Sequence, residues 1–289
     1  MTDGSRAHQL RRALDDTAQE RPLLAVGAVN AIAAHLAAGS GFDALWVSGL
    51  EVSAANGVPD SNVLGPRDLS DVVTSLGRVT EKPVIVDVDN AGGAVSTAER
   101  FAFDLVRAGA AAVCIEDSTY PKCNSFAAHK AQGVEDADLL SRQIERIRKT
   151  LGLDLVVIAR TEALIAGEEM GSAMARAMQY AAAGADAVLL HSKDPTGNQA
   201  LEIGRTWTGG AALVSVPTAF PQLTTDDLGR AGFRLCIYAN QLSRAAMAGM
   251  RAAIRQFTCE GAFVPSPASA LADVGDLLRV GEPGALSCI

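Results

Sequence analysis

The chain has few aromatic residues, few cysteines and no excess of positive charge. Aromatic residues make up 4% of the 289 residues, and the five cysteines include no CxxC pair. An odd number of cysteines without that spacing argues against both a disulfide framework and a structural zinc site. Reduced thiols fit the cytoplasm, so we expect a cytoplasmic protein.

Acidic residues outnumber basic ones, and long apolar runs are absent. The chain has 25 Lys and Arg against 33 Asp and Glu, for a formal net charge of −8. Proteins that neutralise nucleic-acid phosphates carry a basic face, so we expect no nucleic-acid partner. No stretch approaches eighteen apolar residues, and residues 1–6 contain no apolar signal core. We therefore expect neither a membrane partner nor a secretion signal.

What the chain does have is a repeated alternation of strand-like and helical segments. Hydrophobic residues make up 48% and charged residues 20%, which is ordinary for a globular α/β protein. Helical periodicity, as at residues 173–183, separates short apolar runs. We predict eight strands, at residues 23–29, 44–47, 84–87, 112–116, 155–159, 187–190, 212–216 and 234–238.

Eight βα units predict a (β/α)8 TIM barrel. We expect one domain over residues 1–289, with a core of about 22–257 and a helical C-terminal extension at 258–289. An open doubly wound sheet would instead place a GxGxxG loop after the first strand. Gly92-Gly93 follows the third predicted strand and lacks that spacing, so the barrel is favoured.

Acidic residues end two of the predicted strands. Asp87 and Asp89 close the run that begins at Val84, and Glu116 and Asp117 close the next strand. Carboxylates held this close at a buried strand end repel one another unless a cation or a proton lies between them. An all-oxygen set is typical of Mg²⁺. Acids after strands also cap helices, and that alternative stays open here.

In a TIM barrel, catalytic residues lie at the C-terminal ends of the strands. Most of the predicted strands end in polar residues; besides the acids, these ends carry Asn30, Ser48, Arg160, Glu162, His191, Ser192, Lys193, Thr218 and Asn240. Arg160, His191 and Lys193 beside metal carboxylates predict a site for a small, multiply charged anion. Taken singly, Arg160 could pair with Glu162, and His191 could be structural.

Six motifs add specificity: Trp46-Val47-Ser48-Gly49-Leu50, Pro59-Asp60-Ser61-Asn62, Asp87-Val88-Asp89, Glu116-Asp117 followed by Pro121-Lys122-Cys123-Asn124-Ser125, Ala159-Arg160-Thr161-Glu162-Ala163-Leu164-Ile165-Ala166-Gly167, and His191-Ser192-Lys193. Over residues 24–257 the chain resembles the isocitrate lyase/phosphoenolpyruvate mutase superfamily, in its phosphoenolpyruvate mutase and phosphonopyruvate hydrolase branch. The resemblance implies a barrel whose last helix is exchanged between subunits of a homodimer or homotetramer.

The resemblance also implies roles for individual residues. Asp87 would ligate Mg²⁺ directly, while Asp89 and Glu116 would hold its waters. Catalytic roles near the transferring group would fall to Asp60, Lys122, Asn124, Ser125, Arg160 and His191. The small-molecule substrate, a pyruvyl phosphate or phosphonate, would be bound by Trp46, Ser48, Gly49, Leu50, Cys123, Ser192 and Asn240. Backbone amides of residues 48–50 would form a nest for its carboxylate.

Residues 118–132 are polar, contain Pro121 and lack periodicity. In the superfamily this segment closes over the ligand, so we expect a mobile lid that ligand protects.

Three positions depart from the family pattern. Ser118 stands where the mutases have a lysine, which removes a cation near the base of the lid. Cys123 stands where the carbon–carbon lyases have a catalytic cysteine, although only Lys122-Cys123 matches the lyase motif. After Asp89, the sequence at 90–93 lacks the usual aromatic residue, which predicts a reshaped pocket.

We therefore expect a Mg²⁺-dependent enzyme that interconverts phosphoenolpyruvate and phosphonopyruvate through a pyruvate enolate. Phosphonopyruvate hydrolase is one alternative, although that enzyme typically has threonine at the position of Asn124. A carbon–carbon lyase or synthase acting on a 2-oxo acid or a phosphonate analogue is another, suggested by Cys123 and Ser118. A non-catalytic anion-binding barrel would be expected to have lost a metal acid or Arg160, and this chain has both.

Overall fold

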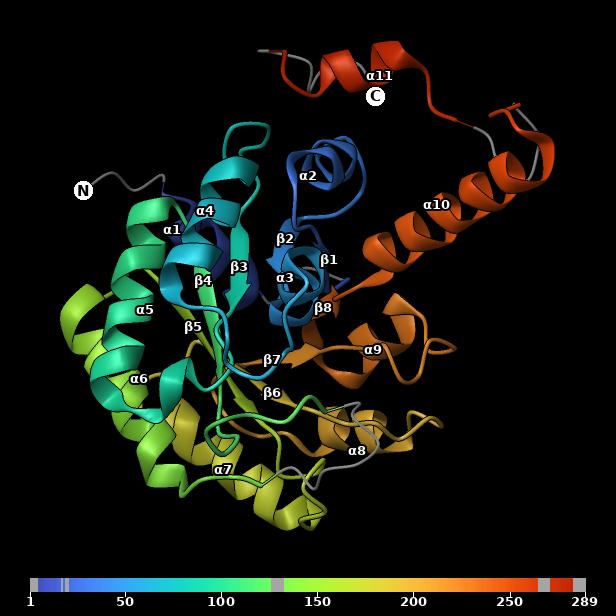
Figure 1. The fold of residues 1–289 in the computed structure, drawn as a ribbon. Helices are drawn as coiled ribbons and strands as arrows, with labels where there is room; N and C mark the ends of the chain where they lie inside the picture. The colour runs from blue at the N-terminus through green and yellow to red at the C-terminus, as the bar shows by residue number, and fades with distance from the viewer. Residues whose placement is uncertain (1–4, 17, 19–20, 126–132, 265–270, 283–289) are drawn as a thin grey trace.

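The barrel prediction is confirmed by the computed structural model, which describes residues 5–16, 18, 21–125, 133–264 and 271–282. Parallel strands pair in chain order and close on themselves (Figure 1). The strands are β1 (Leu23–Gly27), β2 (Ala44–Val47), β3 (Val84–Asp87), β4 (Ala112–Glu116), β5 (Val156–Thr161), β6 (Ala187–Leu190), β7 (Ala212–Ser215) and β8 (Phe233–Tyr238). Each prediction agrees with its strand to within two residues at either end.

Helices between the strands cover the outside of the barrel (Figure 1). They are α2 (Ala31–Ala38), α3 (Gly49–Asn56), α4 (Pro66–Leu76), α5 (Val95–Ala108), α6 (Ala137–Leu151), α7 (Met170–Ala182), α8 (Asn198–Thr206) and α9 (Thr225–Ala231), with a short 3₁₀ turn, η1 (Ala91–Gly93). The helix expected at 173–183 is α7, which begins three residues earlier. Two helices, α3 and α4, follow β2, and the first of them begins at the active-site mouth.

The core has two layers because successive side chains of a strand point to opposite faces. Along β3, Ile85 points into the barrel, whereas Val84 and Val86 pack against the surrounding helices. Alanines such as Ala25 and Ala187 share the barrel interior with Trp46. Small residues in the interior leave room for that one large ring, which accounts for the low aromatic content.

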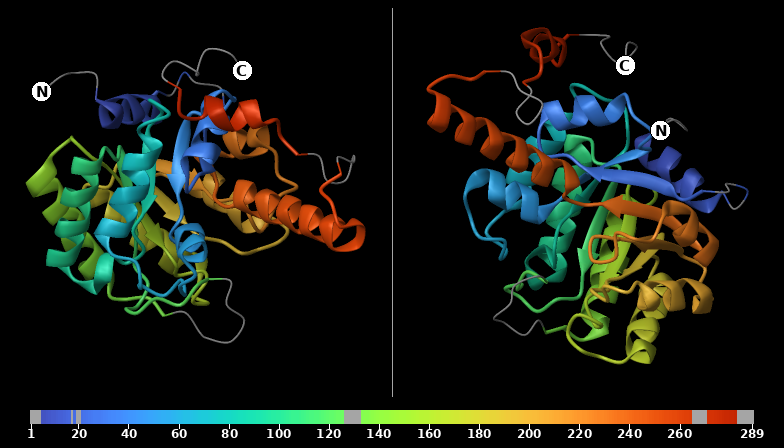
Figure 2. Two further views of the ribbon diagram at one scale, coloured as in Figure 1. Left: turned by 45° about the horizontal axis from the view of Figure 1, so that its top comes forward. Right: turned by 90° about the vertical axis from the view of Figure 1, so that its right-hand side faces the viewer.

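Helix α1 (Arg6–Asp15) closes the N-terminal mouth of the barrel. Leu10 and Leu14 are buried among the interior side chains of the strands. Arg11 donates to Asp186 at 3.0 Å and to the backbone carbonyl of Leu155 at 2.9 Å. Figure 2 shows α1 at the end of the barrel opposite the loop that follows β4. In the described part of the chain, α1 therefore covers the barrel interior at its N-terminal end.

Helix α10 (Gln241–Glu260) projects away from the barrel, and α11 (Val274–Arg279) lies beyond it (Figures 1 and 2). None of the side chains of α10 is buried. Its exposed apolar residues form a helical stripe of Met247, Met250, Ile254 and Phe257. The helix continues past residue 258, where we expected the extension to begin. In the part of the chain that is described, no helix is both long and apolar enough to cross a membrane.

Candidate active site

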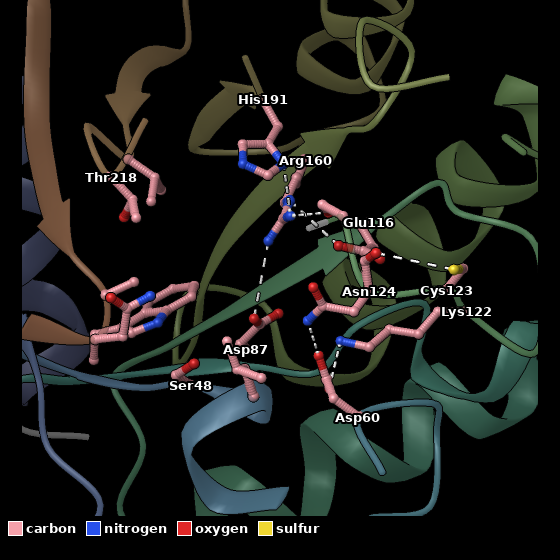
Figure 3. A pocket seen from close by; sticks show the side chains of 16 residues that line it. Ser48, Asp60, Asp87, Glu116, Lys122, Cys123, Asn124, Arg160, His191 and Thr218 are labelled. Atoms are coloured by element: carbon pink, nitrogen blue, oxygen red, sulfur yellow. Dashed lines mark hydrogen bonds and ion pairs between the residues drawn. The ribbon is translucent and has the colours of Figure 1, made fainter. Parts of the chain in front are cut away.

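A cavity of about 60 Å³ opens at the C-terminal ends of the strands (Figure 3). Its lining residues come from seven of the eight βα units. They are Trp46, Ser48, Leu50, Asp60, Asp87, Glu116, Lys122, Cys123, Asn124, Ser125, Arg160, His191, Val216, Thr218, Ala239 and Asn240. All but three of the site residues predicted from the sequence therefore meet at one cavity.

Two acids at the ends of β3 and β4 form one wall. Asp87 is 7% exposed, and its Oδ2 lies 3.9 Å from Nη1 of Arg160. Glu116 is 3% exposed, accepts a 2.7 Å hydrogen bond from the Ser118 hydroxyl and lies 3.2 Å from Nε of Arg160. Asp89 does not line this cavity, because its Oδ1 is bound to Lys122 Nζ at 2.5 Å.

Burial makes two of these acids unusually weak. Burial raises the pKa of Glu116 to about 8, although the charge of Arg160 opposes the shift. Burial likewise raises the pKa of Asp89 to about 7, against the charge of Lys122. The neighbouring cations therefore do not fully compensate the negative charge. A further cation would stabilise the ionised form of both carboxyls.

The carboxylate oxygens of these acids are suitable ligands for Mg²⁺, although the three acids do not lie together as a preformed metal-binding cluster. Among the described residues, no three His, Cys, Asp or Glu side chains are gathered closely enough to hold a metal ion. Asp89 is turned to Lys122, and Glu116 is turned to Arg160. The donors are all carboxylate oxygens, the ligands that Mg²⁺ prefers, and their charge exceeds that of the adjacent cations. Asp87, Asp89 and Glu116 would hold the ion if these two cations gave way.

A second cluster surrounds Glu162, which is fully buried. Its Oε1 accepts from Nε of Arg160 and lies next to Nδ1 of His191, both at 2.6 Å, and its Oε2 accepts from the Ser125 hydroxyl at 2.7 Å. Burial alone would raise the pKa of Glu162, but the charges of Arg160 and His191 lower it below the ordinary value. Burial also lowers the pKa of His191, despite the attraction of Glu162. The geometry thus favours an ionised Glu162 that fixes Arg160 and His191.

Glu162 was not among our predicted site residues, although the sequence contained a signal. Arg160 and Glu162 are two residues apart at the end of one strand, so their side chains point to the same face. We considered Glu162 only as a possible partner that would make Arg160 merely structural. The structure places both at the mouth of the barrel, where their pairing orients the cation.

The described part of the predicted lid, residues 118–125, lies over the cavity. Lys122 Nζ is 2.8 Å from Oδ1 of Asp60, and Asn124 donates to the other oxygen of Asp60 at 2.5 Å. Lys193 donates to the backbone carbonyl of Ser125. Burial would lower the pKa of Lys122, but the surrounding acids raise it, so the ammonium stays charged. Residues 126–132 of the predicted lid lie outside the described residues.

Three predicted residues point elsewhere, and one acid does not join the cluster. Ser192 donates to Gln199 at 2.7 Å and does not line the cavity. Gly49 and Asp89 border a neighbouring cavity of about 210 Å³ on the other side of the acids. Asp117, the fourth of the strand-end acids, does not line the cavity. That carboxylate accepts from Thr161, from Tyr180 and from the backbone of residue 162, which ties β4 to β5.

The wall opposite Arg160 contains neutral groups that are free to bind a ligand. Within the described residues, Trp46 Nε1 and Thr218 Oγ1 are buried without a hydrogen-bond partner, and both residues line the cavity. Ser48 caps the N-terminus of α3, where the first backbone amides have no partner within the helix. Thr218 stood among the polar strand ends in the sequence, but we assigned it no role.

The chain was compared with known proteins. A family model described as phosphoenolpyruvate phosphomutase matches residues 12–258. The phosphoenolpyruvate phosphomutase of Streptomyces hygroscopicus is 38% identical over 230 residues, which cover 78% of this chain and 72% of the relative. The phosphonopyruvate hydrolase of Variovorax sp. (strain Pal2) is 35% identical over 256 residues, with 87% of each protein covered.

Two further similarities bear on the reaction and on the metal. The 2-methylisocitrate lyase of Halalkalibacterium halodurans is 34% identical over 229 residues, covering 76% of this chain and 72% of the relative. A crystal structure of phosphonopyruvate hydrolase in complex with oxalate and Mg²⁺ superimposes with a TM-score of 0.87 at 32% identity, covering 96% of this chain and 95% of that one. The relatives are thus enzymes of three reaction classes on one barrel.

We predict that stabilisation of the protein by Mg²⁺ increases with pH. Because the pKa of Glu116 is raised to about 8 and that of Asp89 to about 7, these carboxyls bind more protons in the folded than in the unfolded state. Without metal, their contribution to stability is therefore lost as the pH rises from about 4.5 to 8. At pH 6 a metal ion must displace protons from these carboxyls. The affinity for the metal ion therefore falls about tenfold for each unit by which the pH is lowered and for each proton displaced.

The measurement is thermal unfolding at pH 6.0, 7.0 and 8.5 with and without Mg²⁺. The rise in Tm on adding Mg²⁺ should be smallest at pH 6.0. In Glu116→Gln, which cannot ionise, the pH dependence of this rise should be weaker. An equal rise in Tm at all three pH values would contradict the prediction.

Proposed function

The chain belongs to the phosphoenolpyruvate phosphomutase family, and on that premise we propose that it is a Mg²⁺-dependent mutase that interconverts phosphoenolpyruvate and phosphonopyruvate. The observation that carries the proposal is the arrangement of Lys122, Asn124, Arg160 and His191 around one small cavity that is floored by strand-end carboxylates. Such a set of donors suits a phosphoryl group.

The charge balance supports a metal requirement. Asp60, Asp87, Asp89, Glu116 and Glu162 surround two fixed cations, Lys122 and Arg160. A site with this excess of negative charge repels an anionic substrate. Bound Mg²⁺ would reverse the local charge and would supply Lewis-acid stabilisation of an enolate oxygen. The magnesium complex of the related hydrolase agrees with this requirement.

Different protein groups would then bind the carboxylate and the phosphoryl group of the substrate. The backbone amides at the start of α3, next to Ser48, suit the pyruvyl carboxylate, because a helix N-terminus attracts anions. Arg160 and His191, held by Glu162, suit the phosphoryl group from one side, and Asn124 suits it from the lid. Transfer of the phosphoryl group from the enol oxygen to carbon three then needs a reorientation of the pyruvate enolate between fixed charges. No proton is transferred to carbon.

The place of Cys123 favours the mutase over a carbon–carbon lyase. Cys123 lines the cavity, and its sulfur lies 3.9 Å from the carbonyl of Asn124. Figure 3 shows Cys123 on the lid side of the cavity, next to Lys122 and Asn124. That position suits a lid side chain better than an acid that protonates carbon.

We expect phosphorus NMR of the enzyme with phosphonopyruvate and Mg²⁺ to show a phosphoenolpyruvate signal. Asp87→Ala should lose at least about a hundredfold in activity because it removes a metal ligand. Its Tm without metal should not fall, since one buried negative charge is removed from an acidic site. Release of inorganic phosphate instead would identify a hydrolase, and full activity in excess chelator would refute the metal requirement.

Two lid variants separate phosphoryl transfer from carbon–carbon chemistry. Cys123→Ser should lose less than about tenfold in rate, or about 1.4 kcal/mol of barrier, if the cysteine only packs in the lid. Asn124→Ala should lose about 10²–10³-fold, because it removes a donor aimed at developing charge. Steady-state rates with phosphonopyruvate measure both. A lyase would be favoured if the wild-type enzyme cleaved a larger oxo acid and the Cys123→Ser variant were inactive. In a lyase, loss of the proton donor costs about 10²–10⁴-fold in rate.

We propose in addition that the protein forms a homodimer or homotetramer in which α10 packs against a second subunit. The support is the stripe of Met247, Met250, Ile254 and Phe257 on a helix that leaves its own barrel with no buried side chain. Apolar stripes of this kind are typical of subunit interfaces.

A charge within this stripe should weaken the assembly. Ile254→Asp should shift the molar mass measured by size-exclusion chromatography with light scattering towards the monomer, because a buried carboxylate without a partner is costly. Ala248→Asp, an exposed position to the side of the stripe, is the matched control and should leave the mass unchanged. A wild-type monomer at micromolar concentration would refute the proposal.

A further inference from the structure

A chain of side-chain hydrogen bonds connects the lid to a metal acid. The backbone N–H of Lys122 donates to Oδ1 of Asn62 at 2.6 Å, and Nδ2 of Asn62 donates to Oδ1 of Asn90 at 3.0 Å. Nδ2 of Asn90 then donates to the carbonyl of Ser118 at 3.2 Å and to its hydroxyl at 3.4 Å. The Ser118 hydroxyl donates in turn to Oε1 of Glu116 at 2.7 Å. Every donor points in the same direction along the chain, from Lys122 to Glu116.

The centre of this chain is held firmly. Asn90 is 3% exposed and Ser118 is 1% exposed. Nδ2 of Asn90 also lies 3.2 Å from the carbonyl of Thr119, and Gln143 donates to the backbone carbonyl of Asn90 at 3.4 Å. Because Asn90 and Ser118 are buried, a broken link leaves a buried polar atom without a partner, which is unfavourable.

The backbone on both sides of Asn90 is strained. Asp89 has φ of 52° and Ala91 has φ of 48°, values in the left-handed region that residues with a Cβ atom avoid. Such residues persist only where the surrounding structure fixes them, and they cluster at functional sites. Here the strained turn aims the Asp89 carboxylate at Lys122 while it directs the Asn90 amide towards Ser118.

None of the three linking residues lines the catalytic cavity, yet both ends of the chain are cavity residues. Asn62, Asn90 and Ser118 come from three different loops, after β2, β3 and β4. A hydrogen bond that only stabilised one turn would stay within one loop. These bonds instead join the three loops whose residues supply Asp60, Asp87 and Glu116 to the site.

We propose that Asn62, Asn90 and Ser118 are positioning residues that couple the orientation of Glu116 to the closure of lid residues 122–125 over the cavity. When the lid is closed, the Lys122 amide fixes Asn62, and the chain holds the Ser118 hydroxyl on Glu116. When the lid opens, Asn62 loses its donor, and Glu116 is less firmly oriented. The metal part of this proposal rests on the proposed function, whereas the hydrogen-bond coupling does not.

The experiment changes one end of the hydrogen-bond chain and measures the effect at its other end. Asn62→Ala alters the lid end, and the readout is the dissociation constant for Mn²⁺, measured by electron paramagnetic resonance as a probe of the metal acids. Ser118→Ala alters the acid end, and the readout is amide hydrogen exchange at Lys122 in metal-free protein. Asn56→Ala is the matched control, since its side chain donates to Val52 at the end of α3, away from the chain.

We expect Asn62→Ala to weaken Mn²⁺ binding at least about fivefold, although Asn62 touches no metal acid, and Ser118→Ala to speed exchange at Lys122 at least about fivefold. Coupled residues are non-additive, so the double variant should bind Mn²⁺ no more than about twofold more weakly than the worse single variant. Asn56→Ala should change neither readout.

The proposal is overturned if each substitution affects only its own end of the chain, or if the two losses in Mn²⁺ affinity multiply. It is also overturned if Asn56→Ala produces the same changes, because a general loss of stability would then explain them. If the wild-type protein binds no Mn²⁺, the proposed metal function fails, and exchange at Lys122 alone decides the coupling: unchanged exchange in Ser118→Ala refutes it, and faster exchange supports it.

Discussion

The active site depends on an excess of buried carboxylates that two cations only partly balance. Lys122 bridges Asp60 and Asp89, and Arg160 lies among Asp87, Glu116 and Glu162. Each cation is held in place by several acids at once, which fixes its position more strictly than one partner would. Burial raises the pKa of Glu116 and of Asp89 by more than Arg160 and Lys122 lower it. The acidic mouth is therefore suited to a further cation and, through it, to an anionic ligand.

The same electrostatics tie the lid to the barrel. Four consecutive lid residues, 122–125, line the cavity. Two of them, Lys122 and Asn124, contact Asp60, which comes from the loop between α3 and α4. A ligand that competes for these acids or for the donors of the lid must alter both groups of contacts. The contacts of the lid and the charged site therefore share the same acids, and the hydrogen-bond chain through Asn90 joins the same loops.

The departures from the family pattern take on a different meaning in three dimensions. From the sequence, Ser118 indicated the loss of a cation at the base of the lid. In the structure its hydroxyl donates to Glu116 and accepts from Asn90, which itself lies in the second unusual stretch. Two positions that differ separately in the sequence are therefore in contact. The hydroxyl cannot replace the charge of a lysine, but it does orient the acid.

The sequence by itself determined the barrel and the composition of its mouth. Eight apolar runs separated by helical segments are a local signal, because strand and helix periodicity appears within about ten residues. The ends of those runs named Asp87, Glu116, Arg160 and His191 as site residues, and the resemblance added Lys122 and Asn124. The tertiary structure decided which partners these groups have. The pairing of Glu162 with His191, the role of Asp117 as a tie between β4 and β5, and the chain through Asn62 and Asn90 all depend on distances between segments far apart in sequence. Such distances follow from closure of the whole barrel, and no local pattern in the chain encodes them.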